Sequence, residues 1–377
     1  MNLFNIIKQR ATHGARLERW LGKDKVERIS KSMKNWYAGP IAVAGVPGNV
    51  WAHAGGDFRG PIRSGQFICA KEFVKMRARA AIQRYGQKQR AHLNAGFASL
   101  SDLIAEATTG KARYFPFTKT GSNGAVGRSN SLWALGAHPG IGDAPGAAPG
   151  GTAFTDATTG AFPFSNPAGG DTQHFVKGEV VSDIAGNTLL LYDLIFGVAK
   201  TINDTATEAV TGVPTRYQST TATDMNYAGG NFLFVQVGLT SLAATAHNWT
   251  VCTYLDQGGA ASTLPSLTGV SGNGIHRFDH PTDQWFAPLE SGDVGVQALT
   301  QMQCSALVAT GVIWFMIGHP IAFMPCPVVD QMSVTDGIMT AFNLVRIFDD
   351  AALAFIEVQK PAVTATTYSG QFMSVAG

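Results

Sequence analysis

The second half of the sequence is a series of short apolar or alternating runs separated by Gly, Asn and Asp, with almost no helical periodicity. The runs with this pattern are residues 175–181, 188–196, 231–239, 249–255, 286–288, 294–306 and 312–317. The four residues from Asp256 to Gly259 have the composition of a turn. Short strands joined by such turns predict a mainly β protein, with a β-sandwich or jelly-roll-like body over residues 151–377. The tail segments 342–348 and 355–358 are further strands or a closing helix, and they could pair with another chain.

The first 98 residues have a different pattern, which predicts an α-helical and partly extended arm. Apolar residues recur at three- and four-residue spacing over 17–36, interrupted at Gly22, so we expect two short helices or one kinked helix there. The Gly- and Pro-rich residues 39–65 favour an extended connector, and residues 67–85 are again predicted to be helical. Such an arm cannot bury much apolar surface by itself, so it must dock on something.

Charge is divided unequally along the chain. Residues 1–119 hold 21 Lys and Arg against 7 Asp and Glu, whereas residues 120–377 hold 7 against 19, so the formal balances are +14 and −12. This asymmetry indicates an arm made for an acidic partner, which could be nucleic acid, another protein, or the acidic half of a neighbouring copy. The alternative is a solvated pair of basic helices. The residues that we assign to partner binding are Arg16, Arg19, Trp20, Lys31, Lys34, Trp36, Lys71, Lys75, Arg77, Arg79, Arg84 and Arg90.

Residues 99–150 connect the arm to the body. Ser99 and Asp102 have the form of a capping box, which predicts a short helix closed by Gly110, and residues 113–118 predict an entry strand. Residues 136–151 are rich in Gly and Pro and favour a linker, or a loop lying over a neighbouring subunit. They contain GIGDAPG, but neither a preceding strand nor a following helix supports a nucleotide-binding loop.

No motif for catalysis is present. The sequence lacks G-x-S-x-G, H-E-x-x-H and G-x-x-x-x-G-K-[ST]. His276 and His280, with Asp279 beside them, are the best candidates for a metal site, but their position between Gly274 and Pro281 favours a loop with hydrogen-bonding or subunit contacts. We therefore expect no enzyme activity, no cofactor and no metal.

Two other features predict a structural role for their residues. Asp193 lies inside the apolar run TLLLYDLIF, where a carboxylate needs a backbone N–H or an Arg as its partner. The four cysteines, Cys69, Cys252, Cys304 and Cys326, have no metal-binding spacing, so free thiols are expected.

The longest uncharged stretch raises the question of a membrane span. No Asp, Glu, Lys or Arg occurs from 294 to 329, and 306–324 is mostly apolar. Its Gly and Pro residues favour two β runs instead, 307–310 and 312–317, ended by Gly318-His319-Pro320. Since no signal peptide is apparent either, we expect no membrane association.

Several stretches resemble structural proteins of tailed bacteriophages. They are SLSDLIA at 99–105 with Gly110-Lys111, SLW at 131–133, PGAAP at 145–149, TDATTGAFPF at 155–164, LLLYDLIF at 189–196 and PLESGDVGV at 288–296. The resemblance covers about residues 98–325 and brings no catalytic residues. It implies a non-enzymatic protein present in many copies in the virion, which assembles in the host cytoplasm. Only 14% of residues are charged and 43 are Gly, which suits a surface covered by other subunits.

Three roles follow as alternatives. The first is a capsid-associated protein, either decoration (cement) or minor shell, that stabilises the head through its basic arm. The second is the major capsid protein itself, and the third is a tail or baseplate protein with a carbohydrate-binding jelly roll. For the third role, the hint is Trp285-Phe286 near Asp279 and Asp283. The expected partners are other copies in a trimer or larger assembly, other capsid proteins, and packaged DNA through the arm.

Overall fold

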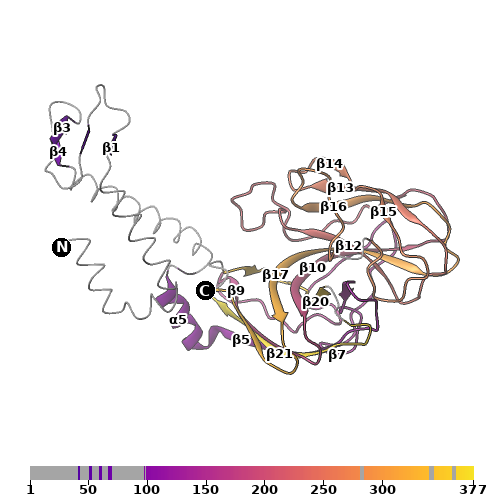
Figure 1. The fold of residues 1–377 in the computed structure, drawn as a ribbon, viewed down its shortest axis with the longest axis horizontal. Coiled ribbons are helices and arrows are strands. Elements are labelled where there is room, and N and C mark those ends of the chain that lie inside the picture. The colour runs from indigo at the N-terminus through magenta and orange to yellow at the C-terminus, as the bar shows by residue number, and fades with distance from the viewer. Residues whose placement is uncertain are drawn as a thin grey trace. The chain divides into compact units, whose positions relative to one another are not determined.

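The computed structural model describes residue 97 and residues 99–377, apart from 281–283, 339–343 and 359–361, together with four short strands among the first 70 residues (Figure 1). The chain divides into two compact units, Met1–Gln89 and Arg90–Gly377. All strand pairs in the second unit are antiparallel, and the mainly β body that the sequence predicts is confirmed.

The described residues of the first unit form two pairs of short strands. β1 (Ile41–Ala42) pairs with β2 (Trp51–Ala52), and β3 (Arg59–Pro61) pairs with β4 (Phe67–Cys69). β1, β2 and β3 lie within residues 39–65, where the sequence predicts extended chain, whereas the helix expected at Phe67–Cys69 is wrong because these residues form β4. Gly and Pro favour both turns between paired strands and extended chain, so the sequence does not distinguish a hairpin from a connector here. The rest of the predicted arm helices lies outside the described residues.

Three sheets build the second unit. The central sheet has the order β12 (Phe232–Val237), β17 (Val312–Cys326), β10 (Asn187–Thr201), β20 (Leu353–Val358) and β6 (Asn130–Ser131), and β8 (Thr152–Ala153) also pairs with β10. The β9 sheet has the order β18 (Ser333–Asp336), β9 (Gln173–Ser182), β21 (Thr367–Ala376), β5 (Ala112–Thr120) and β7 (Ala137–His138), with β19 (Arg346–Ile347) also on β9. The β13 sheet has the order β11 (Glu208–Ala209), β16 (Val296–Cys304), β13 (Asn248–Asp256) and β14 (Ala261–Thr263), with β15 (Leu267–Thr268) also on β13.

The two 15-residue strands β10 and β17 connect two sandwiches (Figure 1). At one end of β10, Leu189 and Leu191 share a core with residues of the β9 sheet such as Phe372. At the other end, Ile195 and Val198 share a core with residues of the β13 sheet. The pairing of β10 with β17 shifts register twice between these two ends, between Leu191 and Tyr192 and between Leu194 and Phe196. One long sheet therefore serves both sandwiches, with its irregularities at the junction.

The opposite face of the central sheet is covered too. Leu190, Tyr192 and Leu194 of β10 pack with Trp133 and Phe154 from the loops. β10 is thus buried on both faces, and this is why its sequence is a continuous apolar run and not an alternating one.

β17 is longer than the sequence predicts. We expected it to end at 317, but it continues through Gly318, His319 and Pro320 to Cys326. Pro320 lies at the register shift opposite Tyr192, where a residue without an N–H is tolerated inside a sheet. The expected strands at 307–310 and 286–288 are absent at those described positions. Much of the apolar stretch 306–324 is therefore a core strand, and no helix in the described part of the chain is long and apolar enough to cross a bilayer.

The tail segments pair within their own chain. β20 lies between β10 and β6, and β21 lies between β9 and β5. The strand alternative for residues 355–358 is confirmed, and their suggested pairing with another chain is wrong because both neighbours of β20 are intramolecular. Residues 346–347 form β19, whereas part of 342–348 lies outside the described residues.

Residues 99–150 contribute to the same sheets as the body. The helix α5 (Leu100–Glu106) starts as predicted, with the Ser99 hydroxyl accepting from the Asp102 N–H at 3.1 Å. The π-helical turn η1 (Ala107–Lys111) follows, and β5 then joins β21. The stretch 136–151 packs in part on its own chain: the Ala148 N–H donates to the Ala199 carbonyl at 3.0 Å.

Candidate functional site

The residues assigned to partner binding in the arm, from Arg16 to Arg90, all lie outside the described residues. The described residues contain four features of possible functional interest: the His276–His280 loop, a buried ion pair, a small surface hollow and the charges on the body.

The His276–His280 segment is a loop packed along β12, as the flanking Gly and Pro predict. The His276 N–H donates to the Val237 carbonyl at 2.9 Å, and both histidines are buried. Burial lowers the pKa of His276. Within the described residues, no group of three or more His, Cys, Asp or Glu side chains is placed to hold a metal ion.

Asp279, between the two histidines, belongs to a structural network. Its carboxylate accepts from Trp249 Nε1 at 2.9 Å and from the Val270 N–H at 2.9 Å, and it lies 2.9 Å from His247 Nε2. Burial opposes ionisation of Asp279, but the hydrogen bond and charge of His247, together with the hydrogen bonds from Val270 and Trp249, outweigh burial and lower the pKa of the carboxyl. Burial likewise disfavours charge on His247, and Asp279 overcomes it and raises that pKa. The network ties the loop to β13.

These contacts exclude Asp279, one of the two carboxylates suggested for a sugar-binding site, as a ligand-binding residue. Asp279 is fully buried, so it cannot meet a ligand at the surface. Trp285 packs edge-on against Phe232, with ring centroids 4.7 Å apart, and lies near Phe323 at 5.5 Å. Asp283 lies outside the described residues.

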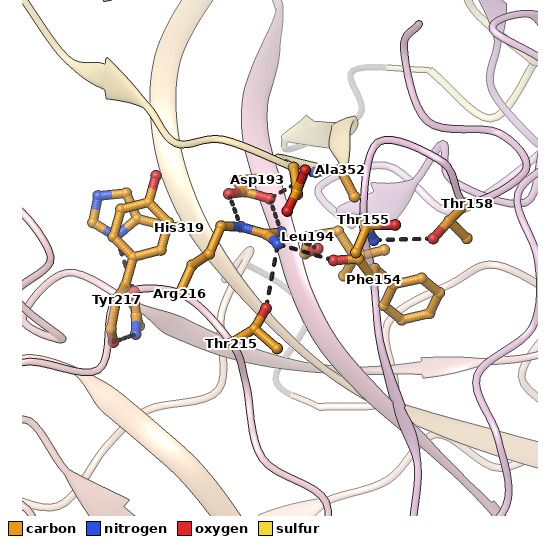
Figure 2. Close-up of polar contacts among 12 residues, drawn as sticks. Phe154, Thr155, Thr158, Asp193, Leu194, Thr215, Arg216, Tyr217, His319 and Ala352 are labelled. Carbon is orange, nitrogen blue, oxygen red and sulfur yellow. Dashed lines mark hydrogen bonds and ion pairs between the residues drawn. The ribbon is translucent and has the colours of Figure 1, made fainter. Parts of the chain in front are cut away.

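A buried ion pair occupies the junction between the two sandwiches (Figure 2). Arg216 Nε donates to Asp193 Oδ2 at 2.8 Å, and Nη2 donates to Oδ1 at 2.7 Å. The Ala352 N–H donates to Asp193 Oδ1 at 3.0 Å, so both partners predicted for this carboxylate, an Arg and a backbone N–H, are confirmed. Arg216 Nη1 also donates to the Phe154 carbonyl at 3.1 Å. One guanidinium thus joins β10, the segment around Phe154 and its own loop.

A stacked aromatic pair extends this junction, as Figure 2 shows. The ring of Tyr217 lies parallel to His319 of β17 with centroids 3.9 Å apart, and Phe348 contacts Tyr217 edge-on at 4.7 Å. Burial lowers the pKa of His319 to about 4, so the imidazole is neutral at pH 7. His319 Nδ1 lies 2.9 Å from Asn231 Oδ1. These ring contacts connect the loop of Tyr217 to β17 and to Phe348.

A small hollow of about 140 Å³ lies beside β5. It is lined by Arg113, Tyr114, Phe115, Pro116, His138, Phe162, Pro163 and Ser165. Its volume suits a single side chain of a partner better than a large ligand.

The surface of the body is acidic, more so than its net charge suggests. The exposed carboxylates after residue 119 are Asp143, Asp183, Asp204, Asp224, Glu290, Asp330, Asp349 and Asp350. The six described cations of the same region, Arg128, Lys177, Lys200, Arg216, Arg277 and Arg346, are all buried or half-buried. Two of them are neutralised internally, since Arg216 binds Asp193 and the buried Lys200 lies 2.8 Å from Glu208. The sequence gives the sign of this charge, but not which charges are covered.

Comparison with known proteins adds little to this description. No protein-family model and no curated protein matches the chain. A structure of infectious bursal disease virus, Gx strain, aligns with 71% of this chain and 80% of its own at 8% identity, with a TM-score of 0.15. The Gt strain structure aligns with 70% of this chain and 80% of its own at 10% identity, with a TM-score of 0.14. At such scores the similarity carries no argument about fold or function.

Proposed function

We propose that this chain is a non-enzymatic structural protein of a tailed-phage particle, present in many copies and associated with the capsid. In this role it decorates or cements the shell, or forms a minor part of it, and its basic N-terminal segment attaches it. The observation that carries the proposal is the division of charge: the cations lie in the first 119 residues, while the body exposes carboxylates and covers its cations.

This division suits repeated assembly. A basic segment and an acidic body on the same chain are complementary between copies, and complementary surfaces steer association and set its register. Acidic surfaces of other capsid proteins, or packaged DNA, would attract the same segment.

Exposed apolar side chains on the body support a surface that other subunits cover. Val328, Val329, Met332 and Val334 lie close together in the sequence around the edge strand β18, with exposed fractions from 44 to 63%. Clustered exposure of this kind is typical of a protein interface.

The test is a truncation measured in assembled particles. Removing residues 1–95 leaves every strand of the three sheets in place, so we expect a folded body that no longer joins particles. Quantitative mass spectrometry of purified particles gives the copy number of the full chain and of the truncated one. A matched variant with Arg16, Arg19, Lys31 and Lys34 replaced by Gln keeps the length of the arm and should also incorporate poorly. Normal incorporation of the truncated chain contradicts the proposal, and a full-length chain found in only a few copies favours the tail or baseplate role.

A further inference from the structure

Phe97 and residues 99–111 are packed on the body through a small apolar cluster. Phe97 and Leu103 pack in a small cluster with Val176, Leu344 and Val375, apart from the three larger cores. Leu103 is the one buried residue of the short helix α5, which leaves Leu100 and Ile104 about half exposed. An element with so few buried apolar contacts opens locally at a small cost in free energy.

A buried histidine lies directly against this segment. His174 of β9 has no exposed surface, and its ring meets Phe97 edge-on with centroids 5.3 Å apart. Neither ring nitrogen has a hydrogen-bond partner of good geometry. Burial lowers the pKa of His174 to about 4, and the positive charge of Arg346 acts in the same direction, while the backbone of Thr172 opposes them.

The charged groups around His174 come from several elements. Arg346 is its partner residue on β19, and Val375, its partner on β21, is uncharged. On its own strand the nearest charges are Lys177 and Glu179, which bind each other. On the docked segment, Asp102 lies in the first turn of α5, and Lys111 Nζ lies 2.9 Å from Glu106 and 2.7 Å from Asp171. Among the described residues no carboxylate contacts His174, so no described anion compensates a proton on its ring.

We propose that His174 makes the docking of residues 97–111 sensitive to pH, so that protonation of its ring releases Phe97 and α5 from the β9 sheet. A protonated His174 beneath Phe97 would be a buried, uncompensated cation, whereas opening of the segment exposes the ring to water. The released residues belong to the second unit, near its start.

The direction and size of the effect follow from proton linkage. The docked state binds fewer protons than the open state, so docking is strongest at neutral pH. It weakens as pH falls below about 6.5 and stops weakening below about 4. Between pH 7 and pH 5.5 the opening equilibrium rises roughly eightfold. Carboxylates ordinarily titrate below this interval.

Hydrogen exchange of the full-length chain tests this. The exchange of amides 100–111, corrected for the intrinsic effect of pH, should report an opening constant about eightfold larger at pH 5.5 than at pH 7. His174→Gln should abolish the pH dependence. His92→Gln, which removes the histidine nearest in sequence before the segment, and His319→Gln, which removes a second buried histidine, should both keep it. An absent rise in the natural chain, or a rise that persists in His174→Gln, overturns the proposal.

A second variant keeps the proposal testable if His174→Gln fails to fold. Phe97→Ala removes the ring that packs against His174 and leaves His174 itself unchanged. Because the coupling is reciprocal, this substitution should raise the pKa of His174 towards the value of an exposed histidine. The ring titration is followed by NMR in both proteins. An unchanged His174 titration in a folded Phe97→Ala chain contradicts the coupling.

Discussion

Arg216 satisfies a carboxylate that would otherwise be uncompensated inside the longest strand of the central sheet. Burial disfavours the charge of the guanidinium, but Asp193 outweighs burial and raises the pKa of Arg216. Replacing one partner leaves the other charge buried and unpaired, so Arg216→Met should lower the free energy of unfolding by about 3–5 kcal/mol in urea titrations. Asp193→Asn added to Arg216→Met should recover part of this loss.

The matched control is Arg277→Met. That guanidinium is half-buried and donates to the uncharged Asn123 carbonyl, at 2.7 and 3.2 Å, so its loss should cost about 1 kcal/mol. If the two substitutions cost the same, the junction is not held by the ion pair. The sequence predicts that Asp193 needs a hydrogen-bonding partner. The body offers few cations for this role, because only seven Lys or Arg follow residue 119. The sequence could not single out Arg216, because the contact depends on how the loop packs.

At the scale of elements, the Gly- and Pro-rich stretch is held by close packing on its own chain. A Cβ on Gly142 would lie 2.2 Å from the indole of Trp133, whereas one on Gly140 would meet nothing within 4 Å. Gly142→Ala should therefore destabilise the body by about 1–3 kcal/mol in thermal or urea unfolding. Gly140→Ala, two residues away, should be neutral or slightly stabilising, because it only restricts the unfolded chain. Equal effects of the two would show that the stretch is loosely attached.

The sequence predicts the strands of the body best where burial is strongest. β10 and β12 are visible as apolar runs because both of their faces are covered. β21 was missed because TYSGQFMSVA is mixed in character and has Gly370 in its middle, a glycine that lets the strand approach the Glu179 carbonyl. The ends of strands also escape prediction, as with Pro320 in β17, because the register of the partner strand decides whether a proline is tolerated.

At the scale of the whole molecule, the opposed charges predict self-association that depends on salt. Screening shortens the range of electrostatic attraction from about 10 Å at 0.1 M to about 4 Å at 0.5 M salt. We expect light scattering of the full-length chain at 0.1 M salt to show trimers or larger assemblies that shrink at 0.5 M salt. Replacing Arg16, Arg19, Lys31 and Lys34 by Gln should reduce the low-salt assemblies in the same way, because it removes the attraction without screening. If association is unchanged by salt and by these substitutions, the apolar residues around β18 are the better candidates for the contact between copies. A protein that stays monomeric under all conditions would contradict assembly from many copies.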